Sequence, residues 1–192
     1  MIQTIKQKFN ESNYTCMIMN DVGAGLVSAR PGIAGQARND GVGADDPVRP
    51  QEQKIIFTST ERGIKPLIDS VHLMRGAYLA DKMLGKAAAL ICVHGGVLAV
   101  YANKMTLAAA EVFAEYGIIF EADEFIERVM NRDMTDLCPM ERLGEQLHCP
   151  KQALCKVTMK LKEMGVGRDD PGALNDTDVP QNCGACCGSR CK

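Results

Sequence analysis

The chain has 192 residues, of which 46% are apolar and 24% charged, and its net charge is −2. This length supports one domain with a full core, and the charge gives no sign of the positive surface that nucleic-acid binding requires. No apolar run reaches the roughly 18 residues of a membrane-spanning helix, and the N-terminus lacks the apolar segment of a secretory signal. Composition therefore predicts a cytoplasmic α/β domain without defining its function.

The first expected elements are two strands, Tyr14–Met19 and Lys54–Ser59, which we predict to pair as a hairpin. Between them, Val22–Pro50 contains six Gly and three Pro and sustains no period of a helix or a strand. Such a segment buries too little apolar surface to offset its ordering entropy. We therefore predict a disordered or loosely ordered insertion over residues 22–50 at the tip of the hairpin, where added length costs little.

Helices and strands are expected to alternate through the rest of a single domain, residues 1–165. Hydrophobic periodicity, Pro and Gly positions and candidate caps predict the following elements in chain order: helix Ile64–Leu73, a buried helix Asp81–Cys92, strand Val97–Ala102, helix Thr106–Tyr116, strand Ile118–Ala122, a short helix Asp123–Met130 with Asp123 as its N-cap, and helices Cys138–Leu147 and Pro150–Met164. This order predicts a mixed sheet, in which an antiparallel hairpin joins parallel βαβ units.

Residues 166–192 are polar and without periodicity, so we expect a flexible tail. Its four cysteines, Cys183, Cys186, Cys187 and Cys191, could hold a metal or an Fe–S cluster. The adjacent pair at 186 and 187 is poor geometry for one four-thiolate site, and a tail without a folded site is the simpler interpretation. The remaining five cysteines are scattered along the chain, and we expect reduced thiols throughout.

Cys138 precedes Pro139 at the start of an expected helix and would be its N-cap. Glu141, three residues later, could then accept a hydrogen bond from the Cys138 backbone N–H, as in half of a capping box. The positive end of the helix dipole favours a thiolate, which makes Cys138 a candidate nucleophile with Glu141 beside it. The simpler interpretation is a half-buried cysteine at the beginning of a helix.

Lys82 and Lys86 lie four residues apart near the start of the predicted helix 81–92, so they would share one face. Lysines in a first helical turn oppose the dipole unless an anion binds there, since free N–H groups and lysines together form a phosphate site. Asp81 could cap this helix or orient a lysine. A solvated edge on an apolar helix is the alternative.

From residue 13 to Gly165, without the insertion, the chain resembles a bacterial and archaeal family, domain of unknown function 1893. The matching stretches span the expected core in order: FTSTERGIKPLID from Phe57, ADKMLGKAAAL from Ala80, VLAVYA from Val97, and Asn131-Arg132-Asp133 with CPME from Cys138. The resemblance implies a cytidine deaminase-like fold, a three-layer α/β/α sandwich around a five-stranded mixed sheet.

An active zinc deaminase needs His/Cys-x-Glu at one helix start and Pro-Cys-x-x-Cys at the next. The corresponding stretches here, residues 81–83 and 104–106, contain neither Cys nor His. We therefore expect no cofactor and no catalytic zinc in the core.

Two functional hypotheses follow. In the first, the former active-site cleft binds a small anionic ligand, such as a nucleotide or nucleotide sugar, lined by Asp81, Lys82, Lys86, Arg132 and Cys138. In the second, an enzyme of unassigned chemistry uses Cys138 as a reactive thiol. Thiol or metal handling by the tail is a further alternative.

Overall fold

The computed structural model describes residues 2–21 and 53–165 of the chain. In chain order the elements are α1 (Ile2–Asn10), β1 (Cys16–Asp21), β2 (Gln53–Ser59), α2 (Lys65–Asp69), the 3-10 turn η1 (Val71–Leu73), β3 (Tyr78–Leu84), α3 (Lys86–Gly95), β4 (Ala99–Thr106), α4 (Leu107–Glu115), β5 (Ile119–Ile126), α5 (Pro139–Glu145) and α6 (Pro150–Glu163). Within these ranges no helix combines the length and hydropathy needed to cross a membrane.

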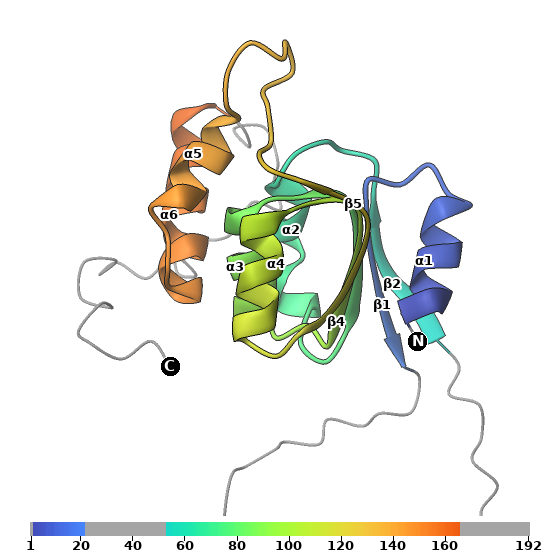
Figure 1. Ribbon diagram of the computed structural model, residues 1–192. Helices are drawn as coiled ribbons and strands as arrows, with labels where there is room; N and C mark the ends of the chain where they lie inside the picture. The colour runs from blue at the N-terminus through green and yellow to red at the C-terminus, as the bar shows by residue number, and fades with distance from the viewer. Residues whose placement is uncertain (1, 22–52, 166–192) are drawn as a thin grey trace, which may run out of the picture.

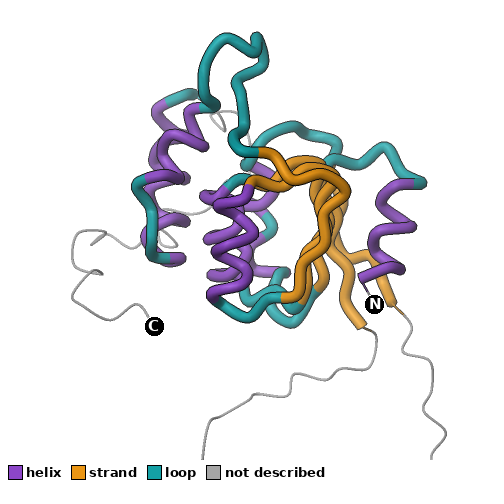
Figure 2. The backbone as a smooth tube through the Cα atoms, viewed as in Figure 1, coloured by secondary structure: helices purple, strands orange, loops and turns teal. Residues whose placement is uncertain are grey.

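The strands form one five-stranded sheet in the order β2-β1-β3-β4-β5. β1 is antiparallel to both of its neighbours, whereas β3, β4 and β5 are parallel to one another. Helix α1 covers one face of the sheet and the other helices lie on the opposite side (Figures 1 and 2). The expected three-layer α/β/α arrangement with a mixed sheet is therefore confirmed.

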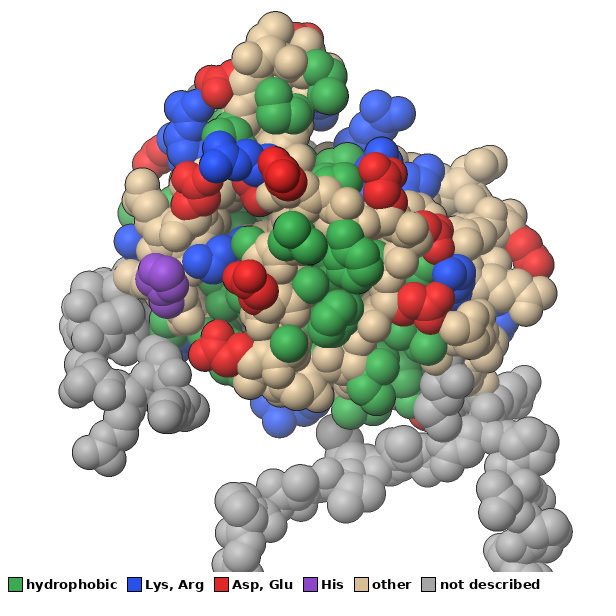
Figure 3. Space-filling view, viewed as in Figure 1, with side chains coloured by type: hydrophobic (Ala, Val, Ile, Leu, Met, Phe, Trp, Pro, Cys, Tyr) green, Lys and Arg blue, Asp and Glu red, His purple; other side chains and the backbone are tan. Residues whose placement is uncertain are grey.

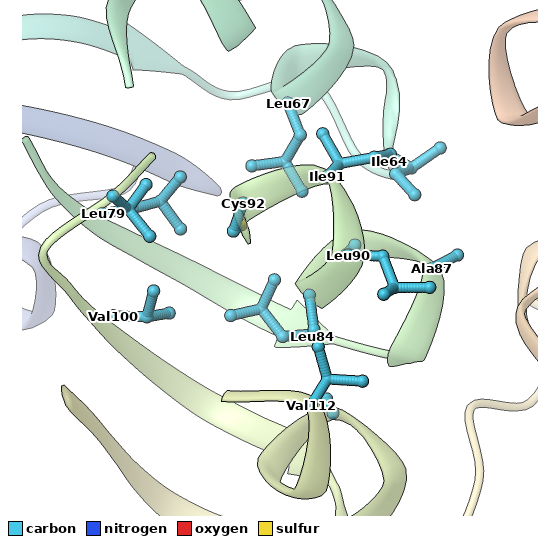
Figure 4. Packing of buried hydrophobic residues seen from close by; sticks show 14 of the residues in the cluster. Ile64, Leu67, Leu79, Leu84, Ala87, Leu90, Ile91, Cys92, Val100 and Val112 are labelled. Carbon is cyan, nitrogen blue, oxygen red and sulfur yellow. The ribbon is translucent and has the colours of Figure 1, made fainter. Parts of the chain in front are cut away.

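Two hydrophobic clusters hold the layers together. The smaller lies between α1 and the sheet, where Ile5 and Phe9 pack against Tyr101. The larger lies between the sheet and α3, with Leu79 and Val100 from the strands facing the buried apolar side of the helix (Figure 4). Helix α3 is apolar almost all round because α4, α5 and α6 also pack against it.

The predicted hairpin is confirmed, because β1 pairs with β2 up to the pair Asp21 and Gln53. The connecting segment 22–50 predicted as an insertion, and the tail 166–192 with its four cysteines, lie outside the described residues.

The predicted helix Asp81–Cys92 is wrong in its first half. β3 continues to Leu84, and the helix begins only at Lys86, after Gly85 as an extended N-cap with φ −98° and ψ 176°. β3 is a central strand, hydrogen-bonded to β1 on one side and to β4 on the other. Pairing on both sides outweighs the local helix preference of this segment.

The predicted helix Asp123–Met130 is also wrong, because β5 runs on to Ile126 in parallel register with β4. Asp123 is a strand residue rather than an N-cap. Its carboxylate accepts a hydrogen bond from the Tyr101 hydroxyl at 2.5 Å and pairs with Lys6 of α1 at 2.8 Å. These partners satisfy the acidic side chain in the sheet, so it does not need a helix N-terminus.

The other helices agree more closely with the sequence. Thr106 caps α4, with its hydroxyl oxygen accepting from the Ala109 N–H at 3.2 Å. α5 and α6 begin with Pro139 and Pro150, as expected. The predicted helix Ile64–Leu73 is divided into α2 and η1 at the buried Ser70.

Candidate functional site

The parallel strands β3, β4 and β5 end on the same edge of the sheet, at the top of the sheet in Figure 1. Gly85 follows β3 there and Thr106 ends β4, so the N-termini of α3 and α4 lie side by side. In sheets of this kind, ligands bind beyond the carboxyl ends of the strands. This edge is therefore the place to look for a site.

Glu141 of α5 extends its side chain over Gly85. An ideal Cβ at Gly85 would lie 2.2 Å from Oε2 of Glu141 and 3.6 Å from Cγ2 of Val129. Only 7% of Glu141 is exposed. A carboxyl group from a distant helix thus lies against the N-terminus of α3, where an anion is electrostatically favoured.

Burial raises the pKa of Glu141 above its ordinary value, and the neighbouring Glu145 raises it further. Lys86 and Arg128 oppose this shift, so both cations lie close enough to act on the carboxyl group. Within residues 2–21 and 53–165, the Glu141 side chain has no hydrogen-bond partner. It is a buried acid flanked by two cations without a direct bond to either.

Helix α5 also covers part of the α3 N-terminus. A Cβ on the buried Gly144 would lie 3.0 Å from the Ala87 nitrogen, so the two helices are in close contact there. The last turn of α5 therefore packs directly against the first turn of α3. The approach leaves little room for a ligand directly above Ala87.

Asp81 is buried in the core rather than lining this edge. It is directly opposite Cys16 of β1, close to Cys92 of α3, and accepts a hydrogen bond from the Met83 N–H at 2.8 Å. Desolvation by burial raises its pKa from 3.8 to about 7. Asp81 neither caps a helix nor orients Lys86.

Lys82 is an exposed strand residue whose backbone N–H donates to the Thr15 carbonyl at 3.0 Å. Side chains alternate along a strand, so Lys82 faces the side opposite to Asp81, towards the α1 layer. The shared helix face predicted for Lys82 and Lys86 is therefore wrong. Only Lys86, the first residue of α3, belongs to the edge that holds Glu141.

Arg132 lies exposed in the loop between β5 and α5. Asn131 fixes the turn of this loop by accepting hydrogen bonds from the backbone N–H groups of Thr135 and Asp136, at 2.9 and 3.3 Å. The second cation that acts on Glu141, beside Lys86, is instead Arg128, which sequence reasoning missed. Its position, two residues after the end of a parallel strand, was the signal available for finding it.

Cys138 is the N-cap of α5, as predicted, and its thiol is free and half-buried. The proposed half capping box is wrong, because the Cys138 N–H donates to the Val129 carbonyl at 2.9 Å and Glu141 turns to Gly85 instead. The role of Cys138 as a nucleophile stays a prediction, and the rate of its alkylation tests it. Cys16 and Cys92 are also free, whereas Cys155 is disulfide-bonded, contrary to the expectation of reduced thiols.

The residues at the two helix starts do not fit a catalytic zinc. Helix α3 opens with Lys86-Ala87-Ala88 and α4 with Leu107-Ala108-Ala109, none of which can ligate a metal. In the part of the chain that the structure describes, no three His, Cys, Asp or Glu side chains form a group suited to a metal ion.

A family model described as a domain of unknown function, DUF1893, matches residues 48–161. Among solved structures, the chain is similar to a DUF1893 family protein from Thermotoga maritima, with 20% identity and a TM-score of 0.61 over 83% of this chain and 88% of that one. At this identity the likeness extends to the fold alone. No curated protein matches.

Proposed function

Because this chain belongs to the DUF1893 family, we propose that it is a cytidine deaminase-like protein that binds a nucleotide or other phosphate-bearing ligand without zinc. The ligand would bind at the carboxyl ends of β3, β4 and β5. The five-stranded mixed sheet with α3 and α4 following adjacent parallel strands supports the relation to deaminases. The absence of His and Cys from both helix starts argues against hydrolytic deamination.

The observation that carries the proposal is the pair of cations around Glu141. Lys86 acts on the buried Glu141 carboxyl from the start of α3, and Arg128 acts on it from the loop after β5. Among residues 2–21 and 53–165, neither makes an ion pair with an acidic side chain. Two cations that converge without a partner at the carboxyl end of parallel strands favour an anionic ligand, and phosphate groups match their donors.

Glu141 sets a condition on such a ligand. A phosphate that approaches Lys86 meets the Glu141 carboxyl, so the acid must be protonated or must move away from Gly85. Its raised pKa makes protonation easier than for an exposed glutamate. A protonated Glu141 could in turn donate a hydrogen bond to the ligand. Binding should therefore tighten as the pH falls.

The test uses inorganic pyrophosphate and a set of ribonucleoside mono- and diphosphates as probes, with calorimetry and thermal unfolding as readouts. A probe at about 100 times its dissociation constant stabilises the folded protein by about 2.7 kcal/mol. Lys86→Ala and Arg128→Ala should each weaken binding about tenfold or more, since each removes a charge-assisted contact. Lys82→Ala is the matched control, because this lysine is exposed on the other side of the sheet, and it should bind as the unaltered chain does.

An equal loss in all three lysine and arginine variants would indicate non-specific attraction and contradict the proposed site. Failure of every phosphate probe to bind would contradict the proposed function. A probe that binds equally well to Lys86→Ala and Arg128→Ala would place the site elsewhere.

A further inference from the structure

An exposed aromatic side chain lies at the same edge of the sheet as Lys86 and Arg128. Leu84, Met105 and Phe125 occupy one row across β3, β4 and β5. Leu84 and Met105 are fully buried in the larger hydrophobic cluster, whereas Phe125 is 49% exposed. Residues in register share a face of the sheet, so the Phe125 ring lies on the side of α3 and α4.

A second exposed apolar side chain, Leu107, accompanies Phe125. Leu107 is the first residue of α4 and is 53% exposed. It directly follows Thr106, which pairs with Ile126, so it lies next to the end of β5 that carries Phe125. Figure 3 shows hydrophobic side chains gathered between α4 and β5, on the face that these elements turn to the viewer in Figure 1. Apolar groups that gather on a surface in this way are typical of a binding site.

The Phe125 ring and the start of α3 are close enough for one small molecule to contact both. Only β4 separates β3 from β5, so the two places are about 10 Å apart, or two strand spacings. The chain crosses this gap between Phe125 and Val129, whose Cγ2 atom lies 3.6 Å from an ideal Cβ at Gly85. Arg128 therefore lies on the path from the aromatic ring to the N-terminus of α3.

Helix α5 limits the direction in which a ligand can extend. Gly144 packs so closely on the Ala87 nitrogen that the side of α3 facing α5 is filled. A molecule whose phosphate binds Lys86 and Arg128 must extend the other way, towards α4 and β5. Two apolar side chains are a small surface compared with the roughly 800 Å² that each partner buries in a protein interface, but they suit part of a small ligand.

We propose that the ligand of this site is a phosphate monoester that carries an apolar group, with the phosphate at Lys86 and Arg128 and the apolar group against Leu107 and Phe125. The inference rests on the proposed function, because it requires the anion at the start of α3. In a nucleotide the base would take the place of the apolar group. A small sugar phosphate would gain nothing there, because its hydroxyl groups would lose water without finding partners.

Three esters test the proposal: phenyl phosphate, n-hexyl phosphate and glycerol phosphate. They share the phosphate monoester and differ in carrying an aromatic ring, a hydrocarbon chain or a polar group. In calorimetry on the full chain, the phenyl or the hexyl ester should bind about fivefold or more tightly than the glycerol ester, because its apolar group leaves water. The tighter of these two distinguishes a ring from a chain.

Variants locate the preference. Phe125→Ala and Leu107→Ala should each reduce it about twofold or more and leave the affinity for glycerol phosphate unchanged. Lys86→Ala should weaken all three esters by the same factor, because it acts on the phosphate that they share. Ile119→Ala is the matched control, since Ile119 is 66% exposed at the other end of β5, and it should keep the full preference.

Equal affinities for the three esters would overturn the inference and leave the phosphate site standing. A preference that Phe125→Ala and Leu107→Ala both leave unchanged, or that Ile119→Ala reduces equally, would overturn it as well. Binding of pyrophosphate without binding of any ester would contradict this inference alone. If neither pyrophosphate nor any ester or nucleotide binds, the proposed function fails with it.

Discussion

The Oε2 atom of Glu141 lies in the space that a side chain at Gly85 would fill, 2.2 Å from the ideal Cβ position. Gly85 has an extended backbone that any residue can adopt, so only this contact excludes alanine. We expect Gly85→Ala to push the flexible Glu141 side chain towards solvent and to cost about 1 kcal/mol. Urea unfolding measures the loss.

The same contact predicts coupling between the two positions. In a Glu141→Ala background the obstruction is gone, so Gly85→Ala should then be nearly neutral. Equal costs in the two backgrounds would show that Gly85 is required for another reason.

The raised pKa of Asp81 should make the free energy of unfolding depend on pH. Its pKa is 3.8 in the unfolded chain and about 7 in the folded one, because burial disfavours the charged form. Between about pH 4 and pH 7 the folded state binds the extra proton, so the free energy of unfolding falls as the pH rises through this range. The loss from this group should be about 4 kcal/mol.

Asp81→Asn stays neutral and keeps an oxygen that accepts from the Met83 N–H. The variant should therefore be more stable than the unaltered chain at pH 8, and the difference should vanish near pH 4. Parallel stability profiles for the two proteins would contradict this assignment.

The hydrogen bonds of the Tyr101 hydroxyl should help to hold helix α1 against the sheet. This buried hydroxyl donates to the Asp123 carboxylate and accepts a hydrogen bond from the Asn10 side-chain amide at the end of α1. Tyr101→Phe leaves these groups without their common partner and should cost about 1 to 2 kcal/mol. Hydrogen exchange in α1 should also speed up. Tyr14→Phe is the control, and a similar loss there would argue against the network.

The Thr106 side chain allows the contribution of one helix cap to the free energy of unfolding to be measured. Thr106→Ala removes the acceptor for the Ala109 N–H and should lower the free energy of unfolding by about 1 kcal/mol. Thr106→Ser keeps the hydroxyl and should lose less. Thermal unfolding of the two variants makes the comparison, and equal losses would mean that the methyl group, not the cap, matters.

Local signals predicted most of the elements, and they failed where tertiary pairing decided the outcome. The alanine run after Lys86 correctly indicated a helix, but residues 81–84 were assigned to it because the pairing of β3 with β1 is invisible to local periodicity. Gly85 was the available boundary signal. Helix α1 was missed although Ile2, Ile5 and Phe9 have helical spacing.

The site was less predictable than the fold. The sequence indicated Lys86 and the start of α5, but the position of Glu141 over Gly85 depends on how α5 packs against α3. That contact joins residues more than fifty positions apart, and no local pattern encodes it. Arg128 enters the site for the same reason, since its neighbours come from other elements.

The place of β1 between β2 and β3 has a kinetic consequence. β3, α3, β4, α4 and β5 follow one another without interruption, so their contacts close short loops, whereas β1 pairs with strands that begin at Gln53 and Tyr78. Closing the longer loops costs more entropy before any contact forms. The parallel unit should therefore form first during refolding. Core substitutions such as Val100→Ala should slow refolding, while Met17→Ala in β1 should mainly speed unfolding.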